Sequence, residues 1–219
     1  YGDEAAVFRA FHDFVDRIDP GGPLLLGADN TGSRDLADHA RSRGLAVRTF
    51  GRAEHADVRI DSLVLRGSGS LFDLVVGGRR LGSVELTVPG AYNAVNAAGA
   101  LGLGLAVGLP FADLARGLAG FSGARRRFEF KGLASGVRVY DDYAHHPTEV
   151  QTAALAAARG VAGDGRVIAV FQPHLYSRTE RFAAGFGAAL AGADVVVVME
   201  VYAAREDPLP GVTGALIAD

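Results

Sequence analysis

The chain has 219 residues and a formal net charge of −3, so its charge indicates neither a nucleic-acid nor a membrane-surface partner. It contains no cysteine, which excludes disulfides, thiolate nucleophiles and Cys-ligated metals. No apolar run approaches the ~18 residues of a membrane span and no signal peptide opens the sequence, so we expect a globular, cytoplasmic protein.

The first 50 residues predict an α/β arrangement. Apolar side chains recur at helical spacing over residues 4–18, and a Pro/Gly cluster ends that helix. A buried strand is predicted at 24–28, followed by a helix that Ser33 caps and that ends near residue 43. A second strand at 45–50 completes a strand–helix–strand passage, which indicates a parallel sheet.

Residues 58–119 predict a different pattern. Three strands are expected, at 58–65, 71–76 and 80–88, and Gly77-Gly78 forms a tight hairpin turn between the last two. Two helices follow, at 92–107 and 111–119. Gly102 and Gly104 lie inside the first of these helices without the third glycine of a dinucleotide fingerprint. Close helix packing explains them better, and an NAD-linked enzyme is disfavoured.

The alternation of strands and helices returns from Arg127. Strands are predicted at 128–132, 137–140, 166–171 and 194–199, and helices at 147–159 and 177–190. We place a domain boundary near residues 121–124, which gives domains of 1–122 and 123–219. The predicted fold class is α/β, with a small antiparallel patch in the first domain and a mainly parallel sheet in the second.

The densest set of titratable groups is DDYAHHPTEV, residues 141–150, which follows the predicted strand 137–140. Polar residues also follow the next two strands, at 172–174 and 200–202. Ligands bind beyond the carboxyl ends of parallel strands, so we expect these three ends to meet at one edge of one sheet. Pro147 and a capping box at 177–180 place helix N-termini there, which suits phosphate or carboxylate.

Other interpretations of these residues remain open. An adjacent Asp pair is often a solvated turn, and adjacent His residues sometimes only cap a helix. Asp142, His145 and His146 could instead hold a metal, but no H-E-x-x-H signature is present and we predict no metal site. The Arg run 125–127 is usually a solvated face, although Arg also binds phosphate in a bidentate manner. Three histidines among surface-like polar residues receive no role: His12, His39 and His55.

Five blocks, in order and spacing, together resemble the Mur ligase family: VPGAYNAVNAAGA (88–100), FSGARRRFEFKG (121–132), DDYAHHPTEV (141–150), VFQPHLYSRT (170–179) and VYAAREDPLPGVTG (201–214). The third and fourth blocks are the most specific. The chain is most similar to members that add L-alanine to UDP-N-acetylmuramate. The resemblance implies that residues 1–122 are the second half of a central ATP-binding domain and 123–219 most of a Rossmann-like amino-acid-binding domain. We therefore expect a fragment without the N-terminal domain and the phosphate-binding P-loop.

The resemblance also implies roles for individual residues. ATP contacts are implied for five of them: Asn93 and Asn96 at the adenine, Arg127 at the phosphates, Asp142 at the ribose, and Tyr143 beside the nucleotide. Catalytic or amino-acid contacts are implied for His145, His174 and Arg178, with Arg178 suited to the alanine carboxylate. Three positions depart from the family's usual residues: Tyr92, Ala144 and Leu175, which stand for His, Gly and Arg. The change at Leu175 removes one cation from the amino-acid side.

The implied reaction is ATP-dependent amide-bond formation in peptidoglycan precursor synthesis. ATP phosphorylates the lactyl carboxylate of UDP-N-acetylmuramate, the alanine amine attacks the acyl phosphate, and phosphate leaves. Mg²⁺ and Arg offset the charge on the phosphoryl group, with the metal ligands expected outside this chain. His145 or His174 is a candidate to accept a proton from the alanine ammonium.

Two further functions stay open. A murein peptide ligase would join a tripeptide to the same nucleotide sugar, and a catalytically silent module would only bind nucleotide. The single lysine, Lys131, is not part of a phosphate-binding loop, so we predict that residues 1–219 alone are inactive. The sequence gives no indication of an oligomeric state.

Overall fold

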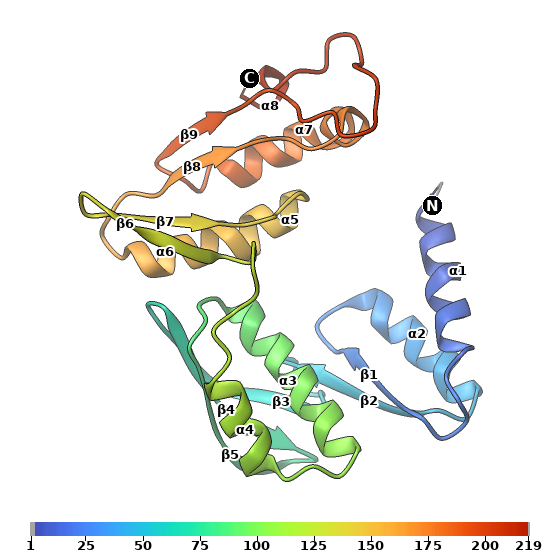
Figure 1. The fold of residues 1–219 in the computed structure, drawn as a ribbon. Helices are drawn as coiled ribbons and strands as arrows, with labels where there is room; N and C mark the ends of the chain where they lie inside the picture. The colour runs from blue at the N-terminus through green and yellow to red at the C-terminus, as the bar shows by residue number, and fades with distance from the viewer. Residues whose placement is uncertain (1–2, 219) are drawn as a thin grey trace. The chain divides into compact units, whose positions relative to one another are not determined.

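The computed structural model describes residues 3–218, and the chain forms two compact units (Figure 1). The first unit comprises Tyr1–Val64, Ser70–Thr87 and Asn93–Phe121. The second comprises Leu65–Gly69, Val88–Tyr92 and Ser122–Asp219. The larger part of the second unit begins at Ser122.

The first unit is built on a five-stranded sheet with the order β1-β2-β3-β4-β5 (Figure 1). The strands are β1 (Pro23–Gly27), β2 (Ala46–Gly51), β3 (Val58–Arg66), β4 (Gly69–Val76) and β5 (Arg79–Leu86). β1 pairs with β2 and β2 with β3 in parallel, whereas β4 and β5 are antiparallel. The turn between β4 and β5 is Gly77-Gly78, whose φ values of 56° and 79° suit glycine. The predicted parallel passage and antiparallel patch are both confirmed.

The helices of this unit are α1 (Glu4–Val15), α2 (Thr31–Ser42), α3 (Ala91–Ala106) and α4 (Phe111–Ala119). The predicted cap of α2 at Ser33 is wrong. Asn30 has an extended backbone, and its side chain accepts a hydrogen bond from the Gly32 amide at 2.8 Å. The helix therefore begins at Thr31, and Ser33 lies inside its first turn. Residues of α1, α2 and β1, with Leu45 just before β2, form a core cluster: Val15, Leu24, Leu26, Ala37, Ala40 and Leu45.

Glycines allow α3 to lie close to its neighbours. A Cβ atom added at Gly102 would clash with the Leu25 side chain and lie 3.1 Å from Val58 Cγ2. A Cβ atom at Gly104 would lie 2.5 Å from Leu114 Cδ2 on α4. The prediction that these two glycines serve helix packing is confirmed, because any larger side chain would overpack the contact.

The second unit contains two short sheets. β6 (Glu129–Ala134) and β7 (Val137–Asp141) are antiparallel, and β8 (Ile168–Phe171) and β9 (Val195–Val198) are parallel. A helical run follows β7 as α5 (Pro147–Glu149), a π-helical segment (Val150–Leu155) and α6 (Ala156–Ala162). The remaining helices are α7 (Tyr176–Leu190) and α8 (Ala215–Ala218), and the core includes Val150, Phe171, Phe186, Leu190 and Ile217.

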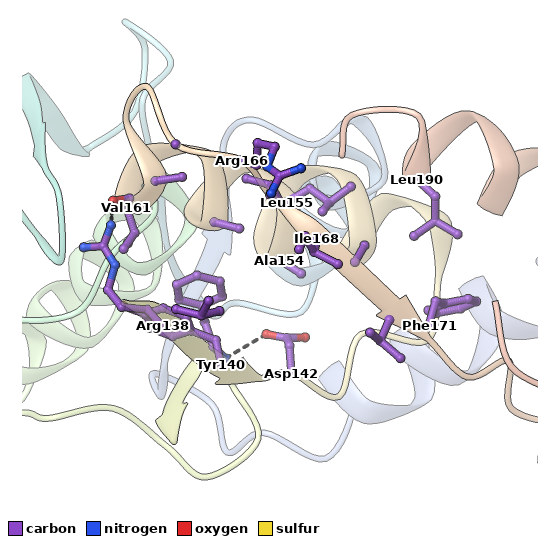
Figure 2. Close-up of a pocket in the computed structure, with 18 of the residues that line it drawn as sticks. Arg138, Tyr140, Asp142, Ala154, Leu155, Val161, Arg166, Ile168, Phe171 and Leu190 are labelled. Carbon is purple, nitrogen blue, oxygen red and sulfur yellow. Dashed lines mark hydrogen bonds between the residues drawn. The ribbon is translucent and has the colours of Figure 1, made fainter. Parts of the chain in front are cut away.

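The prediction that the strands at 137–140, 166–171 and 194–199 share one sheet is only partly correct. β8 and β9 do pair in parallel, but β7 pairs with β6 in a separate sheet. The physical reason is the Ser135-Gly136 turn, whose positive φ values of 50° and 81° fold β6 and β7 into a hairpin. A cavity of about 460 Å³ is lined by residues of β7, α6 and β8 (Figure 2).

Within residues 3–218, no helix combines the length and the apolar character that crossing a bilayer would require. The α/β fold class predicted from the sequence is confirmed in both units.

Candidate functional site

Asp142 fixes the loop that follows β7. One carboxylate oxygen accepts a hydrogen bond from the Phe128 amide at 2.8 Å (Figure 2). The other accepts from the Ala144 amide at 2.7 Å. Each carboxylate oxygen has two lone pairs, so both can still accept a further donor. The side chain is therefore held in one orientation and keeps the capacity to bind hydroxyl groups.

Tyr143 and His145, in the loop after β7, lie against Arg126 of the segment that precedes β6. The Tyr143 amide donates to the Arg126 carbonyl at 2.8 Å, and the Arg126 guanidinium lies 4.1 Å from the centre of the Tyr143 ring. The Tyr143 and His145 rings are 5.0 Å apart, and His145 Nδ1 lies 2.8 Å from the Tyr143 carbonyl. Two predicted site residues are thus in contact, and a cation–π pair with Arg126 orients one of them.

Glu149 connects His145 to Arg127. Its carboxylate accepts the His145 amide at 2.9 Å, and it lies 3.4 Å from His145 Nδ1 and 3.9 Å from the Arg127 guanidinium. Sequence reasoning missed Glu149, although a signal was present. A Glu at the third position of a helix often bonds back to the backbone before the helix, as in a capping box.

The adjacent histidines point to different partners. His146 is the N-cap of α5, accepts from the Thr148 amide at 3.3 Å and packs edge-on against Phe182. Pro147 occupies the first helical turn, as predicted. The helix-capping interpretation of the pair therefore holds for His146, whereas His145 faces Tyr143 and Glu149. Among residues 3–218, no group of three His, Cys, Asp or Glu residues is arranged to hold a metal ion.

A second group of predicted residues lies at the end of β8. His174 Nδ1 is 3.5 Å from an Arg178 guanidinium nitrogen. The His174 ring stacks on Tyr202 at a centroid distance of 5.6 Å, and the two residues form an isolated parallel β-bridge. The bridge extends the parallel pairing of β8 and β9 beyond the strand ends. The end of β8 is therefore held by backbone bonds as well as by ring stacking.

The surroundings of His174 favour its neutral form. Partial burial is the largest cause that lowers its pKa, because the charged imidazolium loses hydration. Three neighbouring basic side chains lower the pKa further, in decreasing order Arg178, His145 and Arg205, and the Glu206 carboxylate opposes them. His146, in the loop after β7, packs against Phe182 of α7, so this loop lies beside the helix that follows His174.

The predicted capping box at 177–180 is not formed. α7 begins at Tyr176 with Leu175 as its N-cap, and no side chain of its own caps it. Ser177 instead donates its amide and hydroxyl to Glu206, at 2.9 and 2.5 Å. The cap was missed because Glu206 is 29 residues later in the chain, beyond the reach of a local pattern.

Six of the eight predicted site residues belong to the second unit: Arg127, Asp142, Tyr143, His145, His174 and Arg178. The other two, Asn93 and Asn96, lie on α3 in the first unit. Their spacing of three residues places them on one face of that helix, where Asn96 is exposed and Asn93 partly buried.

Comparisons with known proteins point to one family. The sequence model of the Mur ligase middle domain matches residues 1–104, and that of the Mur ligase glutamate ligase domain matches residues 126–219. Two curated relatives are UDP-N-acetylmuramate–L-alanine ligases, from Kineococcus radiotolerans at 56% identity over 219 residues and from Acidothermus cellulolyticus at 51% over 218 residues. Both alignments cover 100% of this chain and 46% of the relative.

A solved structure agrees with these matches. The crystal structure of the UDP-N-acetylmuramate–alanine ligase from Thermotoga maritima is similar with a TM-score of 0.65 and 28% sequence identity. The similarity covers 78% of this chain and 41% of that one. The chain thus spans less than half the length of the relatives that it matches.

Proposed function

Because the chain belongs to the Mur ligase family, we propose that its full-length protein is an ATP-dependent ligase that joins L-alanine to UDP-N-acetylmuramate. The observation that carries this proposal is the 56% identity to an alanine ligase across the whole of this chain. The reaction would make a peptidoglycan precursor, and the need for ATP and a nucleotide sugar leads us to propose a cytoplasmic enzyme.

We assign the nucleotide to the loop after β7. Asp142 is suited to the ribose hydroxyls, because its two oxygens are oriented by backbone amides at 2.8 and 2.7 Å. The Arg127 side chain is 54% exposed, and its guanidinium is 3.9 Å from the Glu149 carboxylate, beyond hydrogen-bond distance. It is therefore suited to the phosphates. Tyr143 offers an exposed ring beside the nucleotide, and Asn93 and Asn96 of α3 offer amides for the adenine.

We assign the amino acid to the end of β8 and the start of α7. The Arg178 guanidinium can bind a carboxylate with two parallel hydrogen bonds. Alanine must lose an ammonium proton before its nitrogen can attack, and the lowered pKa of His174 keeps that imidazole neutral near pH 7. His174 therefore remains a candidate proton acceptor, and His145, beside Tyr143, is the second candidate.

The chemistry that these residues would serve is carboxylate activation. ATP transfers a phosphoryl group to the lactyl carboxylate of UDP-N-acetylmuramate, the amine of alanine adds to the acyl carbon, and phosphate leaves. Positioning and charge stabilisation supply most of the rate in such transfers. Residues 3–218 contain no trio of His, Cys, Asp or Glu arranged for a metal, so we assign none of them as a Mg²⁺ ligand.

Measuring ADP release by the full-length protein in the presence of UDP-N-acetylmuramate tests the proposal. We expect ADP release to depend on L-alanine, and we expect Arg178→Gln to raise the KM for alanine at least about tenfold because a bidentate contact is lost. Arg181→Gln on the same helix is the matched control and should leave the KM unchanged. Release with a tripeptide but not with alanine would favour the murein peptide ligase, and no release with either would favour a silent binding module.

A further inference from the structure

The start of α7 is held by a distant residue. Leu175, its N-cap, has φ 73° and ψ 134°, a backbone conformation that a residue with a branched side chain rarely adopts. No side chain of α7 itself caps the helix. The first turn of α7 therefore depends on groups outside the helix to satisfy its amides and to maintain the conformation of Leu175.

Glu206 supplies the missing cap. Its two carboxylate oxygens accept the Ser177 amide at 2.9 Å and the Ser177 hydroxyl at 2.5 Å. The Ser177 hydroxyl and amide are the largest causes that lower the pKa of Glu206, so the carboxylate stays charged at neutral pH. A negative charge at this end of a helix is also favoured by the helix dipole.

Tyr202, four residues before Glu206, holds the chain that leads into α7. The Leu175 amide donates to the Tyr202 carbonyl at 2.9 Å, and the Tyr202 amide donates to the Pro173 carbonyl at 2.8 Å. The buried Thr179 hydroxyl donates to the Leu175 carbonyl at 2.8 Å. Residues 202–206 thus contact the chain both before and after Leu175.

The two residues assigned to the amino acid, His174 and Arg178, lie on the backbone that residues 202–206 hold in place. His174 precedes Leu175, and Arg178 follows Ser177 directly, so their side chains project from the backbone that these bonds fix. The 3.5 Å separation of the His174 and Arg178 nitrogens depends on the conformation at Leu175, because a change of φ there would rotate the helix start relative to the strand end.

We propose that Glu206 is a positioning residue for amino-acid binding, which acts by fixing the first turn of α7 and thereby the separation of His174 and Arg178. The proposal rests on the proposed alanine ligase function for the identity of the amino acid. We assign Glu206 no contact with the substrate, because the bonds that its carboxylate accepts from the Ser177 amide and hydroxyl place its action at the helix start. It follows that loss of Glu206 weakens the binding of alanine and leaves the binding of ATP unchanged.

The test compares Glu206→Ala and Glu206→Gln with Glu180→Gln, an exposed carboxylate on α7, in the full-length protein. We expect Glu206→Ala to raise the KM for alanine about tenfold with the KM for ATP unchanged, since only the amino-acid contacts lose their geometry. Glu206→Gln should have a smaller effect, because its amide oxygen can still accept one donor from Ser177. The Glu180→Gln control should match the unmodified enzyme.

Amide hydrogen exchange at residues 176–179 provides a second readout that does not need turnover. We expect exchange about tenfold faster in Glu206→Ala and no change in Glu180→Gln. An unchanged KM for alanine, or a fall in kcat with both KM values unchanged, would overturn the proposal, and so would unchanged exchange. If the unmodified enzyme releases no ADP with alanine, the proposed function fails instead, and the exchange result alone decides whether Glu206 fixes α7.

Discussion

The surroundings of His174 in the candidate site shift its ionisation. Its pKa is lowered from an ordinary value of 6.5, first by partial burial and then by Arg178. In the pH interval between the lowered pKa and 6.5, the unfolded chain binds more protons than the folded chain. The contribution of His174 to stability therefore falls as the pH drops through that interval, and the neutral imidazole is retained above it.

Removing the nearest cation should shift this titration. We expect Arg178→Gln to raise the pKa of His174 towards its ordinary value, because the positive charge 3.5 Å from Nδ1 disappears while burial remains. Histidine ring signals followed by NMR across a pH series would measure the shift. Arg181→Gln, on the same helix, serves as the control. A His174 titration that Arg178→Gln leaves unaltered would show that the guanidinium does not influence the imidazole.

The sequence identified the candidate site residues better than it identified the groups that contact them. His174 and Arg178 are close because they are four residues apart after β8, and Tyr143 and His145 because they are two residues apart after β7. Glu149 was missed although its place at the third helical position signalled a bond back to the preceding backbone. Arg126 and Glu206 were missed because each acts through stacking or a distant hydrogen bond that no residue pattern specifies. The stacking of His12 on His39 at 4.3 Å, beside Asp16, was missed for the same reason, since it joins two helices.

At the scale of elements, α3 is the helix with the tightest packing requirement. We expect Gly102→Ala to lower the free energy of unfolding by about 1–3 kcal/mol, because the new methyl group would clash with Leu25. Urea unfolding followed by circular dichroism would measure the loss.

Gly117 on α4 is the matched control for this substitution, because a Cβ atom there meets nothing within 4 Å. Gly117→Ala should stabilise the protein by roughly 0.5–1 kcal/mol, because alanine loses less backbone entropy than glycine in a helix. Equal effects of the two substitutions would contradict the close packing inferred for α3.

The periodicity of apolar residues predicted most strands and helices, since local patterns reflect which face of an element is buried. It did not predict the partner of β7, because pairing depends on the connecting turn. Ser135-Gly136 carried that signal: two turn-forming residues between two short strands favour a hairpin. The starts of α2 and α7 were also misplaced, because the helix capping groups are Asn30 and Glu206.

At the scale of the whole molecule, the proposed residue roles are divided between the two units. The adenine contacts are assigned to the first unit, and the ribose, phosphate and amino-acid contacts to the second. The single lysine, Lys131, lies on β6 and pairs with Glu129 at 3.1 Å. It is therefore part of a strand pair in the second unit and not of a phosphate-binding loop.

We accordingly expect residues 1–219 alone to release no ADP when supplied with ATP, UDP-N-acetylmuramate and L-alanine. The same coupled assay on the full-length protein is the control. Alanine-dependent ADP release by the 219-residue chain would show that the phosphate contacts are made by residues to which no such role is assigned.

The sequence separation of Ser177 and Glu206 also sets the earliest point in biosynthesis at which the start of α7 can be capped. A polypeptide that has left the ribosome only as far as β9 already contains all of α7 and can bury Phe186 and Leu190 against β8. The opposite end of the same helix stays without its carboxylate until Glu206 has emerged. The nascent chain can therefore complete the part of α7 next to Arg178 only after the residues that bury Phe186 against β8 have been made.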